Sequence, residues 1–163
     1  MSAADGSLLP ASAQRVQAAL LAAGVAARVI ELAVAARTAQ QAADALGIAV
    51  GQIAKSLIFR AVSSGRAVLV IAAGDRRVDE ARVAAALGEP IERATPEFVR
   101  EHAGFAIGGV APVAHARPMR TFVDASLRRF AVVWAAGGTP HCVFPITPGE
   151  LLRVSSGTEL AVD

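Results

Sequence analysis

The sequence is poor in cysteine, in aromatic residues and in lysine, and each scarcity narrows the classes of protein that it can encode. A single cysteine, Cys142, excludes a disulfide framework within the chain and every zinc motif built from paired cysteines. We therefore predict a reducing, cytoplasmic location. Aromatic residues make up only 4% of the chain, so its core has to be built from Ala, Val, Leu and Ile.

Long apolar runs and a strong charge of one sign are also missing. The alanine-rich stretch 18–36 is interrupted by Arg28 and Glu31, whereas a membrane-spanning helix needs about 20 consecutive apolar residues. Residues 1–10 show no secretory signal pattern, and we expect them to form a flexible tail. The net charge of +2 permits an RNA or phosphate partner. We expect no membrane partner because no membrane-spanning segment is visible, and no DNA partner because no basic recognition helix is visible.

What the sequence does contain is a succession of short helix and strand patterns. Its 163 residues, 54% of them hydrophobic, suffice for one compact domain, which we place at 11–163. Because hairpin patterns dominate, we predict an α/β fold with a mixed, largely antiparallel sheet and helices packed around it. Helices are expected to begin at Ser12, Thr38, Asp79, Thr95 and Thr147, each a residue type that caps helices. The expected strands are 28–32, 53–62, 67–73, 91–94, 120–124, 129–135, 141–146 and 159–162.

Lys55 stands in the middle of the strand pattern Ile53–Phe59, and it is the single lysine among 16 basic residues. Lysine is a compact ammonium on a slender stem whose pKa shifts on burial, whereas arginine is a broad fork that stays charged. A half-buried position that needs one small cation, or one amine able to lose a proton, therefore favours lysine. A surface lysine extended along an edge strand is the alternative, and the strand alone leaves both interpretations open.

A glycine-rich loop and an arginine pair each follow a predicted element. Gly108 and Gly109 lack a Cβ and can direct backbone N–H groups at a carbonyl, an oxyanion or a phosphate, while Pro112 stiffens the loop. Arg76 and Arg77 follow a buried strand, where α/β folds often bind ligands, and they can bind phosphate. Taken singly, both segments are also typical of plain turns.

His141 and Cys142 are adjacent but do not form a nucleophile and base pair, because neighbouring side chains on a strand point to opposite faces. We predict that Cys142 is a small core residue, and that His141 is a candidate to line a pocket. The other histidines, His102 and His115, belong to no motif. The sequence also contains no phosphate-binding loop, dinucleotide fingerprint or nucleophile elbow.

Four segments, in this order, resemble the YbaK/prolyl-tRNA-synthetase-associated family, the stand-alone relatives of the editing domain in bacterial prolyl-tRNA synthetases. They are the helix 38–47, the strand around Lys55, the loop 74–79 and the loop 108–112. The resemblance covers about residues 12–163. It implies a barrel-like mixed sheet with flanking helices, and hydrolysis of a mischarged amino acid from tRNA without a metal or cofactor.

The resemblance also implies roles for individual residues. The family's strand lysine falls on Lys55 and its Gly-x-x-x-Pro loop on 108–112, so Lys55, Gly108 and Gly109 are the expected catalytic residues. The loop backbone would hold the aminoacyl end, and Lys55 would orient the ester or the terminal nucleotide. A water would attack, helped by the vicinal hydroxyl of the terminal adenosine. The expected substrate-binding residues are Ser56, Ile58, Phe59, Arg76, Val110, Ala111, Pro112, Gly138 and His141.

The amino acid removed stays open among Ala, Cys, Ser and Thr, because the segment 137–142 varies within the family. Pocket size also discriminates by only ~1–3 kcal/mol per methylene. The expected partners are the acceptor end of tRNA and, as an open alternative, an aminoacyl-tRNA synthetase, with the chain a monomer or weak dimer. The alternative functions are a non-catalytic module that binds tRNA or a synthetase, and an enzyme that uses Lys55 as a Schiff-base nucleophile.

Overall fold

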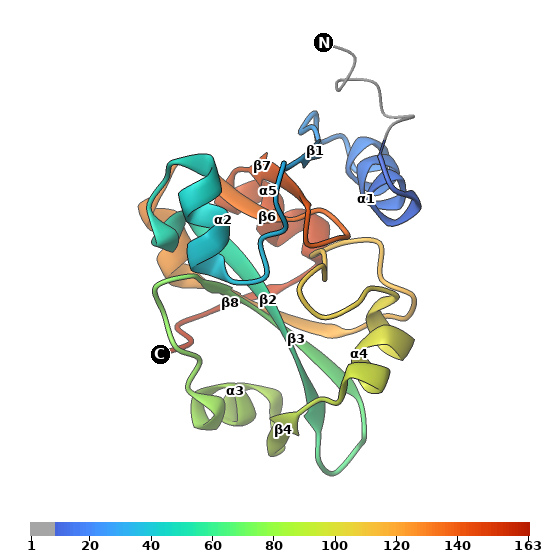
Figure 1. Ribbon diagram of the computed structural model, residues 1–163. Coiled ribbons are helices and arrows are strands. Elements are labelled where there is room, and N and C mark those ends of the chain that lie inside the picture. The colour runs from blue at the N-terminus through green and yellow to red at the C-terminus, as the bar shows by residue number, and fades with distance from the viewer. Residues whose placement is uncertain (1–8) are drawn as a thin grey trace.

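The computed structural model describes residues 9–163, which form a mixed sheet of eight strands with five α-helices packed around it (Figure 1). The strand order is β1-β7-β6-β2-β3-β5-β8, and β4 pairs with β2 beside this path. Four pairings are antiparallel and three are parallel, which confirms the predicted fold class. The strands are β1 (Ile30–Glu31), β2 (Ile53–Ala61), β3 (Ala67–Ala73), β4 (Ile91–Arg93), β5 (Arg120–Asp124), β6 (Val133–Ala136), β7 (Cys142–Ile146) and β8 (Thr158–Leu160).

The helices begin where short polar side chains can satisfy free backbone amides. Thr38, Asp79, Thr95 and Thr147 each accept a hydrogen bond from an amide of the following turn, as predicted. The helices are α1 (Ala11–Ala22), α2 (Ala39–Leu46), α3 (Glu80–Leu87), α4 (Pro96–Ala103) and α5 (Pro148–Ser155).

Two predictions at the ends of elements were wrong. Ser12 does not cap the first helix but lies inside its first turn, because Pro10 occupies the cap position with a φ of −57°. The predicted strand 129–135 is shortened to β6, since a 3₁₀ turn, η4 (Ala125–Arg129), precedes it. The Asp124 carboxylate starts that turn by accepting a hydrogen bond from the Ser126 amide. Of the predicted tail 1–10, residues 1–8 lie outside the described range, and Leu9 is buried.

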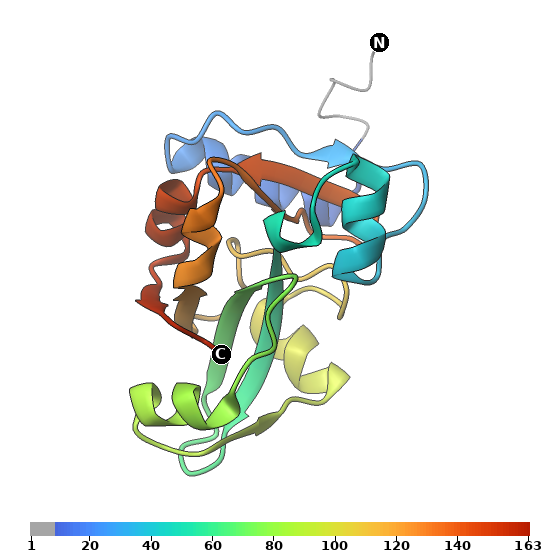
Figure 2. The same ribbon diagram turned by 90° about the vertical axis from the view of Figure 1, so that its left-hand side faces the viewer.

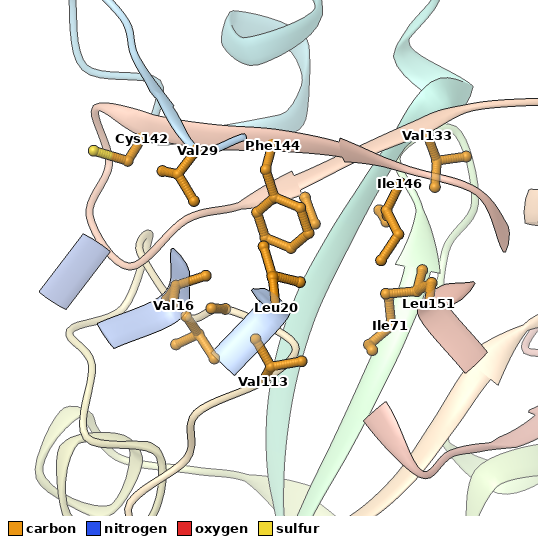
Figure 3. Close-up of a cluster of buried hydrophobic side chains, with 14 of the residues drawn as sticks. Val16, Leu20, Val29, Ile71, Val113, Val133, Cys142, Phe144, Ile146 and Leu151 are labelled. Atoms are coloured by element: carbon orange, nitrogen blue, oxygen red, sulfur yellow. The ribbon is translucent and has the colours of Figure 1, made fainter. Parts of the chain in front are cut away.

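The core lies on both faces of β3, which is buried along its whole length. On one face, Val16 and Leu20 of α1 pack toward Phe144 of β7 within a cluster that includes Ile71 of β3 (Figure 3). On the other face, Val83 of α3 packs with the strand residues Phe59, Val68, Val70 and Phe122. A strand that is covered on both sides has a continuous apolar sequence, which is why the sequence of segment 67–73 predicted a buried strand.

The sheet opens along one edge of β2. This edge pairs with β6 at Ile53 and Ala54 and with β4 at residues 59–61, so residues 55–58 have a strand neighbour only on the β3 side. Figure 2 shows β2 running between α2 at one end of the molecule and α3 with β4 at the other. The opening is therefore framed by elements that lie far apart in the sequence.

The direction of the backbone groups at this gap follows from the β2–β3 register. The Ile53 carbonyl accepts from the Gly74 amide, and the Ala61 amide donates to the Arg66 carbonyl, both at 2.8 Å. Odd-numbered residues of β2 thus face β3, so Ser56 and Ile58 direct their amide and carbonyl groups into the gap.

Within residues 9–163, no helix combines the length and the apolar character needed to cross a membrane.

Candidate active site

Two adjoining cavities lie at the gap in the sheet. The larger has a volume of about 710 Å³ and extends toward the loop before α3 and toward β4. The smaller, of about 250 Å³, lies between β2, β6 and the start of α2. Six residues line both cavities, so the predicted lysine and the predicted glycine loop border the same space. These shared residues are Lys55, Ser56, Leu57, Ile107, Gly108 and Val110.

The two polar side chains of β2 at this junction have no protein partner. Lys55 is half-buried, and in the described part of the chain its ammonium makes no hydrogen bond or ion pair. The Ser56 hydroxyl is buried and likewise lacks a hydrogen-bond partner. As strand neighbours they leave opposite faces of the sheet, yet both line the two cavities because the gap passes through the sheet. A buried polar group without a partner calls for an explanation, and a catalytic role or a bound ion or water is one.

The two loop glycines differ in what they can offer a ligand. Gly108 has a φ of +92°, a left-handed conformation that favours glycine, and it lines both cavities. The Gly109 amide instead donates to the Ala106 carbonyl at 3.0 Å, and Gly109 lines neither cavity. A Cβ on Gly109 would lie 2.8 Å from Cα of Thr139, so this glycine permits close packing of the loop on the β6–β7 turn. Of the two glycines, Gly108 alone borders the cavities, and that its N–H group is directed at a ligand stays a prediction.

The glycine loop is anchored at both ends by side-chain contacts, one from the distant helix α1 and one from a residue just after the loop. At its start, Arg15 of α1 donates to the Gly104 carbonyl at 3.0 Å and lies 4.6 Å above the centre of the Phe105 ring. At its end, the His115 Nε2–H donates to the Ala111 carbonyl at 2.7 Å. Burial lowers the pKa of His115, which keeps the imidazole neutral at physiological pH. These anchors fix the backbone that borders the cavities.

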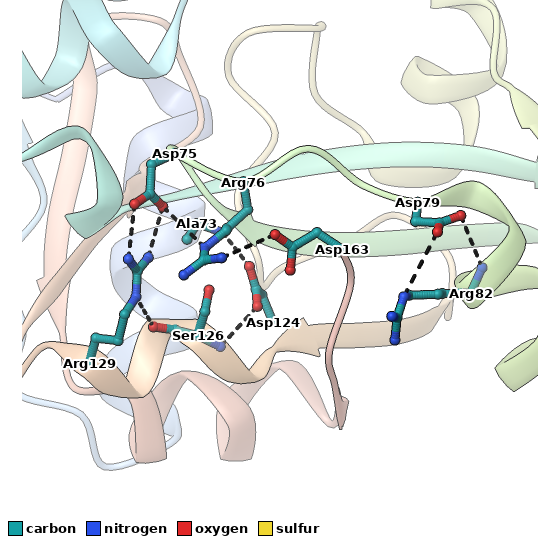
Figure 4. A network of polar contacts seen from close by, with 9 residues as sticks. All are labelled: Ala73, Asp75, Arg76, Asp79, Arg82, Asp124, Ser126, Arg129 and Asp163. Carbon is teal, nitrogen blue, oxygen red and sulfur yellow. Dashed lines mark hydrogen bonds and ion pairs between the residues drawn. The ribbon is translucent and has the colours of Figure 1, made fainter.

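The Arg76 side chain forms ion pairs with two carboxylates (Figure 4). Its guanidinium lies 3.1 Å from the Asp163 carboxylate and 3.9 Å from that of Asp75. Asp75 in turn accepts two hydrogen bonds from Arg129, at 2.8 and 2.9 Å, and these bonds hold the pKa of the Asp75 carboxyl below its usual value. Arg76 lines the larger cavity, as expected of a substrate-binding residue, but its charge is already balanced.

The remaining predicted site residues divide into two groups. Ile58 and Phe59 line the larger cavity. The other group lines neither cavity and consists of Ala111, Pro112, Gly138 and His141.

Each residue of the second group has another place in the structure. Ala111 and Pro112 are buried behind the loop. Gly138 lies against α1, where a Cβ would be 2.8 Å from the Ser12 carbonyl oxygen. The His141 side chain is exposed, whereas its neighbour Cys142 is buried, as the strand alternation predicted.

Several lining residues were missed because sequence patterns do not reveal them. Arg93 reaches the larger cavity through the pairing of β4 with β2, a long-range contact with no local signal. Trp134 lines the smaller cavity through the parallel pairing of β6 with β2. The exposed Ile107 could have been suspected, since a large apolar side chain directly before a paired glycine is unusual for a plain turn. Within residues 9–163, no group of three or more His, Cys, Asp or Glu side chains is arranged to bind a metal ion.

An unpaired ammonium, a left-handed glycine and open strand backbone border one gap in a mixed α/β domain, and this arrangement is chemically suited to a small carbonyl or anionic ligand. The chain belongs to the aminoacyl-tRNA editing domain family, whose profile matches residues 33–154. This match confirms the family that the sequence resembles.

Similar proteins support this assignment. The chain is 35% identical to the uncharacterized protein YwhH of Bacillus subtilis strain 168 over 127 residues, which are 78% of this chain and 80% of YwhH. A crystal structure of a trans-editing enzyme candidate for prolyl tRNA synthetase is 44% identical, with a TM-score of 0.89, and covers 95% of this chain and 98% of its own. The hypothetical protein APE2540 is 28% identical, with a TM-score of 0.83 and coverages of 89% and 96%.

Proposed function

We propose that this protein is a trans-editing deacylase that hydrolyses the ester between a small amino acid and tRNA. The main observation behind the proposal is that Lys55 and Gly108 both line the junction of the two cavities. The family assignment supports it, as does the 44% identity to the structure described as a trans-editing enzyme candidate for prolyl tRNA synthetase.

The chemistry requires positioning and charge stabilisation rather than a strong nucleophile. An aminoacyl ester is already activated, so a water oxygen can attack the carbonyl carbon directly. The ribose oxygen then leaves with a proton, and the free amino acid and tRNA are released. The Lys55 ammonium and the Gly108 amide are the candidates to offset the negative charge that develops on the carbonyl oxygen. Removing one such contact typically lowers the rate by ~10²–10³.

The strand backbone at the gap supplies a place for the amino group of the substrate. Ser56 directs its carbonyl toward the gap, where it can accept a hydrogen bond from the α-ammonium group. Its unpartnered hydroxyl adds a second acceptor. A charged group placed there gains more than a neutral one, because hydrogen bonds to ions are about twice as strong.

The smaller cavity suits the side chain of the amino acid. Its walls include Ile53, Trp134, Cys142 and Val143, and its volume of about 250 Å³ lies below the ~300–1,000 Å³ of pockets for drug-sized ligands. We therefore assign it to a small side chain of the Ala, Cys, Ser or Thr class. We further propose action in the cytoplasm on the acceptor end of tRNA, in concert with a synthetase.

The test is a deacylation screen on tRNAs charged with Ala, Cys, Ser and Thr, with the protein supplied at catalytic and at stoichiometric amounts. The proposal expects multiple turnovers on at least one of the four substrates. If the protein bound or protected the charged tRNA without turnover, the result would indicate a non-catalytic binding module instead of a deacylase. A covalent adduct trapped by borohydride with a carbonyl compound would instead indicate Schiff-base chemistry at Lys55.

A further inference from the structure

The larger cavity carries an excess of positive charge. Four cationic side chains line it, namely Lys55, Arg76, Arg77 and Arg93, against two acidic ones, Asp79 and Glu80. Both acidic residues stand at the start of α3, where the helix dipole favours negative charge. The Asp79 carboxylate is further occupied by two backbone amides and by Arg82. The two acidic residues of the lining therefore do not balance its cationic side chains, of which Arg76 alone is paired, with carboxylates outside the lining.

Arg77 and Arg93 are the arginines of this lining that remain available. Arg76 is held by Asp163, whereas Arg77 and Arg93 are exposed and make no hydrogen bond or ion pair within residues 9–163. They come from two separate elements, the loop after β3 and the end of β4. Two guanidinium groups brought to one cavity by different elements are suited to bind phosphate, because their planar forks match its oxygens.

We propose that Arg77 and Arg93 bind the phosphodiester groups of the last unpaired nucleotides at the 3′ end of tRNA. This inference rests on the proposed function, since it gives the larger cavity to the RNA and the smaller one to the amino acid. The volume of the larger cavity, about 710 Å³, falls within the ~300–1,000 Å³ of pockets for small molecules and cofactors, so the cavity can admit part of the RNA end. The exposed Ile107 stands at the junction of the two cavities and offers an apolar surface to the terminal base.

The assignment to RNA predicts a particular dependence on salt. Each phosphate neutralised on a single strand contributes ~0.7 to the slope of log affinity against log salt. Arg77→Gln and Arg93→Gln should each reduce the magnitude of this negative slope by ~0.7, and the double variant should reduce it by ~1.4. A purely structural role would leave the slope unchanged. Because neither arginine has a protein partner, the thermal midpoints of the variants should match that of the wild type.

The experiment measures the binding of fluorescent uncharged tRNA by anisotropy across a salt series. One tRNA has an intact 3′ end, and a second lacks its last three nucleotides. Wild type should prefer the intact tRNA, and the double variant should lose this preference. Arg100→Gln is the matched control, because Arg100 is an exposed arginine of α4 that lines neither cavity and whose side chain has no partner in the described chain.

Two outcomes would overturn the inference. Unchanged salt slopes in Arg77→Gln and Arg93→Gln would show that neither arginine meets a phosphate. If the wild type bound adenosine monophosphate as tightly as intact tRNA, the site would be one for free nucleotides and not for an RNA end. The binding assay uses uncharged tRNA, so a wild type that binds as expected but deacylates nothing would refute the proposed function while leaving this site in place.

Discussion

Replacing Gly109 with alanine perturbs the candidate active site at a point that the ligand need not touch. The backbone of Gly109 packs directly on Thr139 in the β6–β7 turn. An added Cβ would lie 2.8 Å from Cα of Thr139 and 3.0 Å from both its N and C atoms. All three atoms belong to the backbone, so no side chain can rotate away. The loop itself has to move.

The size of the effect follows from these distances. Carbon atoms in good contact are ~3.5–4.0 Å apart, so the loop must retreat by about 0.7 Å at Gly109. Overpacking of this kind costs ~1–3 kcal/mol of stability. Displacement of a positioning group by about 1 Å can lower the rate of reaction ~10²-fold. Gly109→Ala should therefore lose far more activity than its modest destabilisation would explain at a temperature where it is folded.

Single-turnover deacylation and urea unfolding, measured on the same preparations, provide the assay. Gly149→Ala is the matched control, since Gly149 lies in the first turn of α5 with no atom within 4 Å of the added Cβ. The control should keep the wild-type rate. A Gly109→Ala variant that is as stable and as active as the control would refute the view that this loop must sit tightly on the turn at Thr139.

Three further predictions concern single residues. Burial lowers the pKa of His115 below 6.5, so acid favours the unfolded chain and stability should decline as the pH falls from 6.5 through the native pKa. His115→Gln keeps a donor for the Ala111 carbonyl but should remove this part of the decline, as urea unfolding at neutral and mildly acidic pH would reveal. Thr38→Ala deletes the cap of α2 and should cost ~0.5–2 kcal/mol in the same unfolding assay, whereas Thr38→Ser should cost less. Burial raises the pKa of Cys142, so alkylation by iodoacetamide should be slow in the native protein and fast in urea.

The features that local chemistry determines could be predicted from the sequence. The helix starts at Thr38, Asp79 and Thr147 followed from capping residues, and β3 followed from its unbroken apolar run. The position of Lys55 on a strand followed from the apolar pattern of Ile53–Phe59, whereas its placement beside the Gly108 loop was expected from the family resemblance.

The features that depend on distant partners could not be predicted. The gap beside residues 55–58 exists because β6 and β4 pair with the two ends of β2. Neither pairing can be recognised from the local sequence of β2. The ion pair of Arg76 with Asp163 joins residues 87 positions apart in the sequence. The packing of Gly138 on α1 likewise depends on a contact between distant segments, which no local pattern reveals.

The central claim is that the Lys55 ammonium stabilises charge at the reacting ester, and Lys55→Met tests it most directly. Methionine keeps the length of the stem and removes the charge, and Lys55 has no protein partner in the described chain whose loss could disturb the fold. The measurement is the single-turnover deacylation rate on the best substrate of the screen. The account predicts a fall of ~10²–10³ with the thermal midpoint unchanged. Deacylation at the wild-type rate by the folded variant would contradict it.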